Sequence, residues 1–175
     1  MSDSFFAKLR ESAEEHGYFA VLTVDFEDEG RDYDRRDEFV DKGFWEYPGK
    51  NHVMEDRVCN LFVGDVVLLK TAISVASGLE AYGVTKPMQA MCLLAAGKVV
   101  ENGLDGHNVK IEWQRFEEPL NFFALDTKEP IELFKLGQKS DSLDAERALL
   151  DFALVEPKQD LEAFLADERW ASLKD

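Results

Sequence analysis

The sequence predicts an α+β fold in which a mostly β body carries helices at both ends. β-branched and aromatic residues dominate the stretches from Tyr18 to Phe26 and from Leu61 to Lys70. Turn residues that include glycine separate two further apolar stretches, Met91 to Glu101 and His107 to Trp113. Near both ends of the chain, apolar residues recur instead at helical spacing, so the period changes from strand to helix there.

The length and composition suit one domain, or one domain with a helical appendage. The chain has 175 residues, 45% of them hydrophobic, which is typical of globular proteins. It contains no apolar stretch of about 18 residues, and its first residues lack the basic and apolar regions of a signal peptide. We therefore expect a cytoplasmic protein with a β-barrel domain over residues 1–136 and a helical extension over 137–175.

The first third of the chain predicts a helix, a strand and a charged segment. Ser4 to His16 has helical spacing, with Ser4 as a candidate N-cap and Gly17 where a helix would end. Tyr18 to Phe26 then has the composition of a strand. The charged run from Glu27 to Glu38 indicates either a solvated loop or a short exposed helix.

The middle of the chain predicts buried strands. Gly64-Asp65 interrupts an apolar run and indicates a turn or bulge just before a buried strand that ends near Lys70. The stretch from Thr71 to Met88 is small and polar, which is typical of a long connection. The segment from Asn102 to Gly106 predicts the turn of a hairpin.

The last third predicts two short strands and two helices. Asn121 to Asp126 and Pro130 to Leu136 are the candidate strands. Ser142 is a candidate cap for a helix that reaches about Leu154, and Lys158 to Leu173 carries an apolar stripe at helical spacing.

The charge is strongly acidic but unevenly distributed. The net charge is −16, which opposes contact with phosphate groups. Residues 1–39 carry 12 acidic and 5 basic side chains, residues 40–120 carry 11 and 8, and residues 121–175 carry 13 and 7. The central segment is therefore the part of the chain on which a basic groove is most easily built.

Several classes of catalytic site lack support. The histidines are His16, His52 and His107, and no nucleophile elbow or Cys-His signature accompanies them. Cys59 and Cys92 stand in apolar contexts without a CxxC pair, as expected of reduced core thiols. The phosphate-binding P-loop spacing is absent.

The carboxylates also fail to predict a metal-dependent nuclease. Asp65, Glu101 and Glu112, with Lys70, do not form a compact nuclease signature. We therefore expect a protein that is not an enzyme and that needs no cofactor and no metal.

An aromatic segment, Phe44-Trp45-Glu46-Tyr47, allows two interpretations. Large aromatic side chains mostly serve burial, so the segment can simply fill the core. However, Gly43 and Pro48-Gly49 bound it, as in a loop, and Lys50-Asn51 follows with hydrogen-bond donors. Aromatic faces in such a loop can hold a base that has been lifted out of its stack.

The order of these motifs resembles the EVE and YTH domains of the PUA-like group. The stretch from Trp45 to Asn51, the Gly64-Asp65 pair and the strand from Gly97 to Val100 follow the order of an EVE domain. The chain is most similar to the amino-terminal modules of McrB-type modification-dependent restriction proteins. There, a Gly-Asp strand ending in Lys, as at Lys70, and a Val-x-x-x-Trp strand, as at Val109 to Trp113, recur. The resemblance covers roughly residues 40–126.

The resemblance implies a PUA-like (EVE/YTH-type) β-barrel flanked by N-terminal and C-terminal helices, with a pocket for a modified base. Trp45 would form one wall of that pocket, and Asn51 would line it. Tyr82 or Tyr47 would supply a second aromatic wall. Lys70 would either meet phosphate at the pocket mouth or stand in solvent at the end of its strand.

The remaining candidates are weaker. Trp113 would pack the barrel, although the family pattern also has a tryptophan there. Lys98 and Arg115 would either contact phosphate or stay solvated. The full set of expected base- or phosphate-binding residues is Trp45, Tyr47, Lys50, Asn51, Lys70, Tyr82, Lys98 and Trp113.

By resemblance, the function would be that of a non-catalytic module that binds DNA, or RNA, by base flipping and reads a methylated base. Its partners would then include an AAA+ motor and a nuclease of a restriction system, supplied by other domains or proteins, and no membrane. The acidic charge supports an alternative, a DNA mimic or protein-interaction (anti-defence) protein that docks on a basic partner. A third alternative is an enzyme that acts on nucleotides through an unrecognised carboxylate site.

Overall fold

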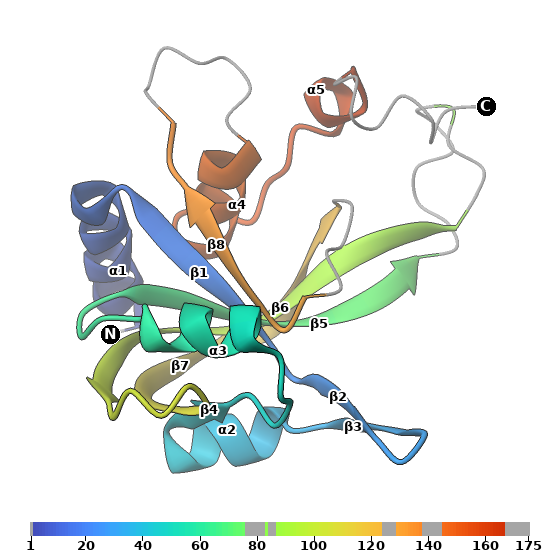
Figure 1. Cartoon of the computed structure of the whole chain (residues 1–175). Helices are drawn as coiled ribbons and strands as arrows, with labels where there is room; N and C mark the ends of the chain where they lie inside the picture. The colour runs from blue at the N-terminus through green and yellow to red at the C-terminus, as the bar shows by residue number, and fades with distance from the viewer. Residues whose placement is uncertain (1, 76–82, 84–86, 124–128, 138–144, 167–175) are drawn as a thin grey trace.

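The computed structural model describes residues 2–75, 83, 87–123, 129–137 and 145–166. Helices and strands alternate irregularly along the chain, as expected for an α+β fold (Figure 1). The helices are α1 (Ser2–His16), α2 (Arg36–Lys42), α3 (His52–Cys59), α4 (Ala145–Leu154) and α5 (Leu161–Ala166). The strands are β1 (Tyr18–Thr23), β2 (Asp25–Asp28), β3 (Arg31–Asp34), β4 (Phe44–Glu46), β5 (Val66–Val75), β6 (Met88–Asn102), β7 (Asn108–Phe123) and β8 (Ile131–Lys135).

One six-stranded sheet organises the described residues. Its strand order is β4-β7-β6-β5-β1-β8, and β2 pairs with β3 in a separate hairpin. β1 and β5 run parallel, while the other neighbouring pairs are antiparallel. The sheet curls strongly into a half-barrel, and the β2–β3 hairpin projects away from it (Figure 1). The α+β class predicted from the sequence is confirmed.

Both faces of the sheet are buried, which explains the continuous apolar runs in its strands. Along β1, Ala20 and Leu22 join one core cluster, and Phe19 and Val21 join the other. The first cluster lies beneath α2, α3 and the buried Trp45. The second lies beneath α1 and α4. Helices from both ends of the chain therefore close the same face.

The first helix is confirmed and begins earlier than predicted. α1 starts at Ser2, so Ser4 lies inside the helix and the prediction that it is the N-cap is wrong. Gly17 ends the helix as expected, with φ of 77° and its N–H donating to the Ala13 carbonyl oxygen at 2.8 Å. The predicted strand is real but ends at Thr23, and β2 begins at Asp25.

The charged run after β1 is an exposed hairpin followed by a helix. Its turn places Glu29 at φ 50° and Gly30 at φ 77°, the left-handed pair that a tight hairpin turn needs. α2 then begins at Arg36. The prediction of a solvated loop or a short exposed helix is wrong up to Asp34, because Phe26 and Tyr33 pair across two strands, and a short helix is present only from Arg36.

The Gly64-Asp65 pair forms the predicted turn before β5. The Asp65 side chain is buried and accepts hydrogen bonds from the Tyr18 hydroxyl at 2.5 Å and from the Phe62 N–H at 2.8 Å. Burial, the hydrogen bond and the negative charge of Asp65 together raise the pKa of Tyr18 to about 12. The turn is therefore tied to the first residue of β1, which lies next to β5 in the sheet.

The hairpin between β6 and β7 is confirmed, and both strands are longer than predicted. β6 spans Met88–Asn102 and β7 spans Asn108–Phe123, so residues 121–123 end β7 instead of forming a separate strand. β5 continues to Val75, which corrects the predicted start of the connection, and residues 76–82 and 84–86 lie outside the described part. Gly97 permits close pairing here, because a Cβ would stand 2.4 Å from the Glu112 carbonyl oxygen.

The C-terminal elements agree with the predicted helices over the part described. β8 is confirmed, α4 reaches Leu154, and α5 covers Leu161–Ala166. The proposed cap Ser142 and residues 124–128 and 167–175 lie outside the described residues. α4 buries Leu149 and Leu150 in the same cluster as α1 and the sheet. No helix in the described ranges is long and apolar enough to cross a membrane.

Candidate functional site

Trp45 is part of the core. It lies in β4, which pairs with β7, and its side chain has 0% exposed surface. Its indole N–H donates to the carbonyl oxygen of Thr23 at 2.9 Å. The expectation that Trp45 stands in an open loop as the wall of a base pocket is wrong. The hydrogen bond from the Ile111 N–H to the Gly43 carbonyl oxygen, at 2.9 Å, draws this segment into the sheet and leaves the indole no face for a ligand.

Tyr47 and Asn51 also have structural roles. Tyr47 is buried, and its ring stacks on His107 with centroids 6.1 Å apart. Its hydroxyl accepts a hydrogen bond from the Asn51 N–H at 3.3 Å. The Asn51 side chain caps α3 by accepting from the Val53 and Met54 N–H groups. The expectation that both residues line a base pocket is therefore wrong.

Two further candidates lie on the strands of the β6–β7 hairpin. Trp113 is half-buried, and its indole N–H donates to the Phe44 carbonyl oxygen at 3.1 Å. It therefore packs against the core, as one of the two interpretations predicted. Lys98 is exposed, and its ammonium group lies 3.5 Å from the Glu112 carboxylate. These contacts leave Trp113 packed on the core and Lys98 paired on the surface.

Lys70 differs from the other candidates, because it lines a pocket. Its exposed fraction is only 3%, so the expectation of a solvated strand end is wrong. Lys50 is exposed on the loop before α3, and Tyr82 lies outside the described residues. Among the sequence-predicted residues that the structure describes, Lys70 alone lines this pocket.

The pocket has a volume of about 1120 Å³. It lies where the end of β1 and the β2–β3 hairpin meet β5, the start of β6 and the residues before β8. Backbone hydrogen bonds fix two parts of its wall, because Thr23 N–H donates to Pro130 O and Val24 N–H donates to Lys70 O, each at 3.0 Å. The lining residues are Thr23, Asp25, Phe26, Glu27, Asp32, Tyr33, Asp34, Lys70, Ala72, Gln89, Glu129 and Pro130.

Two aromatic rings of the hairpin line the pocket. Phe26 and Tyr33 pair across the hairpin with centroids 6.2 Å apart. Phe26 also packs edge-on against the buried Phe39 at 6.0 Å, so its ring is held by the core. Tyr33 is 40% exposed and keeps a free surface. Sequence reasoning missed both rings, and Gly30 was the one local sign of a turn between them.

The hairpin is fixed to β5 through Asp25. Its carboxylate accepts hydrogen bonds from the Thr71 hydroxyl at 2.8 Å and from the Ala72 N–H at 3.1 Å. Its own N–H donates to the Thr23 hydroxyl oxygen at 3.1 Å. These bonds set the angle at which the hairpin leaves the sheet, and so they set the pocket's width.

Two other lining carboxylates are committed to arginines. Asp34 accepts from Arg36 at 2.9 Å, and these hydrogen bonds raise the pKa of the Arg36 guanidinium. Glu129 accepts from Arg57 at 2.5 Å, and the same guanidinium binds the Ile131 carbonyl oxygen at 3.0 Å. Both ion pairs hold carboxylates that line the pocket in fixed positions.

Trp45 contacts the pocket wall from the core side, through a hydrogen bond to its backbone. The Thr23 carbonyl oxygen that accepts its indole N–H belongs to a residue of the pocket wall. Trp45 is thus a positioning residue: it holds the backbone of a residue that lines the pocket and does not line the pocket itself.

Carboxylates compensate several arginines of the described residues. Ion pairs hold six arginines: Arg10, Arg35, Arg36, Arg57, Arg115 and Arg147. Over the described residues, no group of three or more His, Cys, Asp or Glu side chains is placed to hold a metal ion. The lining of the pocket therefore combines the aromatic surface of Phe26 and Tyr33 with carboxylate groups and the Gln89 amide.

Comparisons with protein-family models, curated proteins and solved structures give no match.

Proposed function

We propose that the chain is a non-catalytic nucleic-acid-binding module that receives a flipped, methylated base in the pocket between the end of β1 and the β2–β3 hairpin. The observation that carries the proposal is the exposed ring of Tyr33 beside Phe26, above a wall that contains Thr23 and Gln89. The curled sheet with helices on both faces supports a PUA-like (EVE/YTH-type) barrel as the scaffold.

The chemistry of the pocket suits an amine-bearing base. Each aromatic ring that stacks on a base contributes about 1–3 kcal/mol. Glu27 and Asp32 provide carboxylate acceptors in the lining. An N-methylated exocyclic amine keeps one N–H for such an acceptor and presents its methyl group to the Tyr33 ring. Discrimination between methylated and unmodified bases is then a difference of a few kcal/mol, set by the fit of the methyl group.

The charge pattern predicts an unusual salt dependence. The slope of log K against log salt is about −0.9 per phosphate neutralised on B-form DNA. Because the arginines named above are held by carboxylates, few phosphates will be neutralised. We expect weak binding with a shallow slope, strengthened when a basic partner such as an AAA+ motor subunit tethers the module.

The test is a titration of labelled duplexes that carry N6-methyladenine, 5-methylcytosine, 5-hydroxymethylcytosine or no modification, at low salt. Tyr33→Ala should weaken binding to the preferred duplex by about tenfold or more, the loss expected for one stacking ring. The matched control is Phe62→Ala, because Phe62 is also an exposed aromatic residue, at 61%, and does not line the pocket. Equal affinity of wild type and Tyr33→Ala for all four duplexes would refute the proposal.

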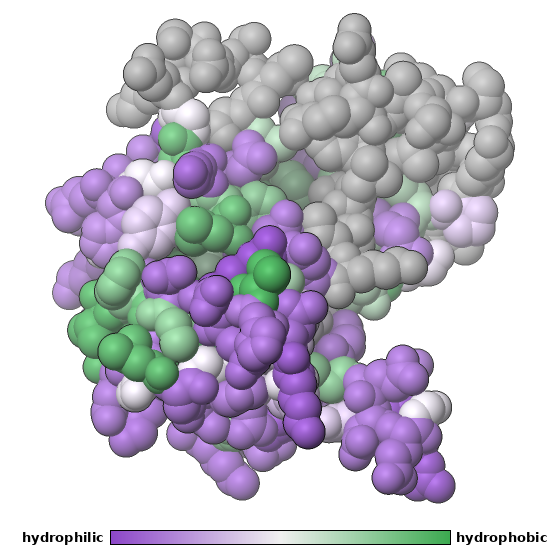
Figure 2. Space-filling view, in the orientation of Figure 1, coloured by the Kyte–Doolittle hydropathy of each residue, from purple (hydrophilic) through white to green (hydrophobic). Residues whose placement is uncertain are grey.

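A second candidate function is favoured by the hairpin surface. Figure 2 shows the projecting hairpin as a hydrophilic arm at the lower right. It carries the exposed acidic residues Glu27, Asp28, Glu29 and Asp32. Arg31, between them in the sequence, is the basic residue of the hairpin. Such an arm suits a DNA mimic that docks on a basic protein. A mimic would bind none of the duplexes and would compete with DNA for a basic partner, so the same titration separates the two functions.

A further inference from the structure

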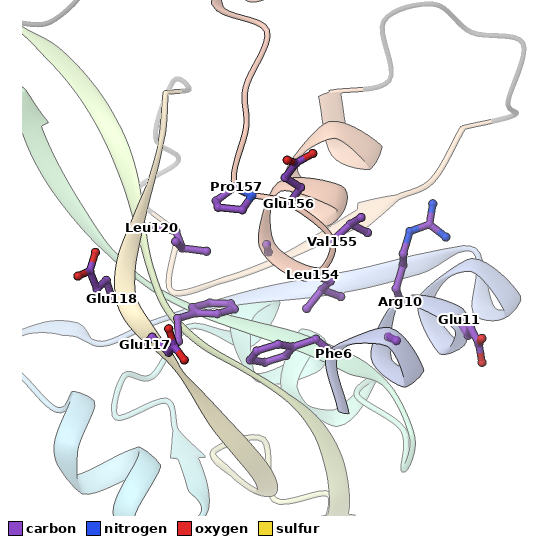
Figure 3. Close-up of a pocket in the computed structure, with 13 residues that line it drawn as sticks. Phe6, Arg10, Glu11, Glu117, Glu118, Leu120, Leu154, Val155, Glu156 and Pro157 are labelled. Carbon is purple, nitrogen blue, oxygen red and sulfur yellow. The ribbon is translucent and has the colours of Figure 1, made fainter. Parts of the chain in front are cut away.

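A second hollow, of about 940 Å³, lies between α1, β7 and the C-terminal end of α4. Figure 3 shows side chains from all three elements around it. It shares no lining residue with the pocket described above. The apolar part of its lining includes Phe6, Phe116, Leu120, Leu154, Val155 and Pro157. We call this hollow the α1–β7–α4 groove.

The groove leaves apolar surface open to solvent. Val155 is 63% exposed, and Phe6 and Phe116 are half-buried with their ring centroids 5.2 Å apart. Below them, Leu154 is only 7% exposed and anchors the floor to the core. A rigid floor with open apolar side chains above it suits the apolar face of an incoming segment.

The rim of the groove is acidic. Glu11, Glu117, Glu118 and Glu156 line it, and all four residues are exposed (Figure 3). The single lining cation, Arg10, donates to the Asp151 carboxylate at 2.8 Å, so its charge is already compensated. An occupant therefore meets net negative charge around an apolar centre.

The backbone of β7 disfavours an added strand in this groove. Ala95 pairs with Arg115 and Leu93 with Leu120, so residues 116–119 of β7 bulge opposite the single residue Leu94. Pro119, within the bulge, has no N–H to donate. A bulge and a proline are the usual protection of a strand against edge pairing. The occupant must therefore bind through side chains, as a helix does.

The negative charge of the rim determines which kind of helix can bind in the groove. Nucleic acid and anionic membrane surfaces carry the same sign as the rim and would be repelled. A second copy of the chain carries a net charge of −16 as well, so self-association through this face is opposed too. A helix with apolar residues on one face and lysine or arginine beside them satisfies both the floor and the rim.

We infer that the α1–β7–α4 groove docks a basic amphipathic helix of a partner protein. The apolar face of the helix covers Phe6, Phe116 and Val155, and its flanking cations pair with Glu117 and Glu118. This inference is independent of base binding, because the two sites share no residue.

The probe is a labelled helical peptide of about 14 residues, roughly 21 Å long, with leucines at i, i+3, i+4 and i+7 and lysines elsewhere. Binding to the full chain is measured by fluorescence anisotropy at low salt. One control peptide has the same composition with the leucines scattered around the helix. Another has glutamate in place of lysine. Binding of the amphipathic basic peptide alone is the expected result.

Two pairs of variants locate the peptide. Val155→Lys should weaken binding by about tenfold or more, as expected for a residue at the centre of a helix-in-groove contact. The matched control, Val53→Lys, changes another exposed valine, on α3, and should have no effect. The double variant Glu117→Gln, Glu118→Gln should weaken binding more than Glu27→Gln, Asp28→Asn on the hairpin.

The outcomes are distinct. Equal binding by both basic peptides, or equal loss in the groove and hairpin variants, would show simple attraction between opposite charges and overturn the inference. Failure of the amphipathic peptide to bind would overturn it as well. Thermal melting of each variant checks folding. If Val155→Lys does not fold, the double variant Glu117→Gln, Glu118→Gln still tests the groove, because glutamine keeps nearly the volume of glutamate.

Discussion

The indole N–H of Trp45 and the carbonyl oxygen of Thr23 form a 2.9 Å hydrogen bond inside the core, and Thr23 is also part of the pocket wall. This bond connects β4, at one edge of the sheet, to the end of β1. A tryptophan that the sequence suggested as a ligand contact thus holds the backbone on which the pocket is built.

Replacement of Trp45 tests this positioning role. Trp45→Phe should leave a buried carbonyl oxygen without its donor, which costs about 1–3 kcal/mol. Trp45→Ala should cost about 3–5 kcal/mol, because it also leaves a cavity. Denaturant unfolding measures both, with Val53→Ala on exposed α3 surface as the control. Wild-type stability in Trp45→Phe would contradict the assigned bond.

Asn51 provides a second test of a residue first expected to read a base. Asn51→Ala should reduce the free energy of unfolding by about 1 kcal/mol through loss of the α3 cap. Asn51→Ser should retain most of the stability, because serine is also a good N-cap. Comparison with Lys50→Ala, next to it on the exposed loop, separates capping from general effects on this segment. Equal stability of Asn51→Ala and wild type would argue against capping.

Gly97 should tolerate no side chain. A Cβ there would stand 2.4 Å from the Glu112 carbonyl oxygen and 2.9 Å from the Trp113 ring. Gly97→Ala should therefore destabilise the protein by about 1–3 kcal/mol, the usual cost of overpacking. Gly103→Ala is the matched control, because nothing lies within 4 Å of its added Cβ. Thermal melting of the two variants should differ clearly, and identical melting would show that β6 and β7 are less closely paired here.

The Tyr18–Asp65 bond predicts loss of stability at high pH. The folded pKa of Tyr18 is about 12, above the ordinary value of about 10. The protonated hydroxyl therefore contributes stability that is complete below pH 10 and is lost as the pH rises through 12. Phenolate absorbance should show one tyrosine of the folded protein that ionises at higher pH than the others. This step should be absent in Tyr18→Phe. A late step that persists in Tyr18→Phe would assign it to another tyrosine.

Much of the fold was predictable because local signals agreed with the final packing. The helix ending at Gly17, the Gly64-Asp65 turn and the hairpin after β6 depend on residues close together in the chain, and all three are confirmed. The charged run from Glu27 to Glu38 was misread, since Tyr33 is its one aromatic residue among many charges. Tyr33 packs against Phe26, which in turn packs against Phe39 further along the chain, and the sequence pattern does not reveal such contacts.

The sequence by itself determined the α+β class, the positions of β1, β5, β6, β7 and β8 along the chain and the acidic charge, because period, turn residues and composition are local properties. Only the tertiary structure decided which aromatic residues face solvent. Trp45 and Tyr47 became core, while Tyr33 and Phe26 came to line the pocket. The physical reason is that burial depends on which strands pair: β4 joined the edge of β7 and turned its indole inward, whereas the β2–β3 hairpin left the main sheet and kept a ring exposed.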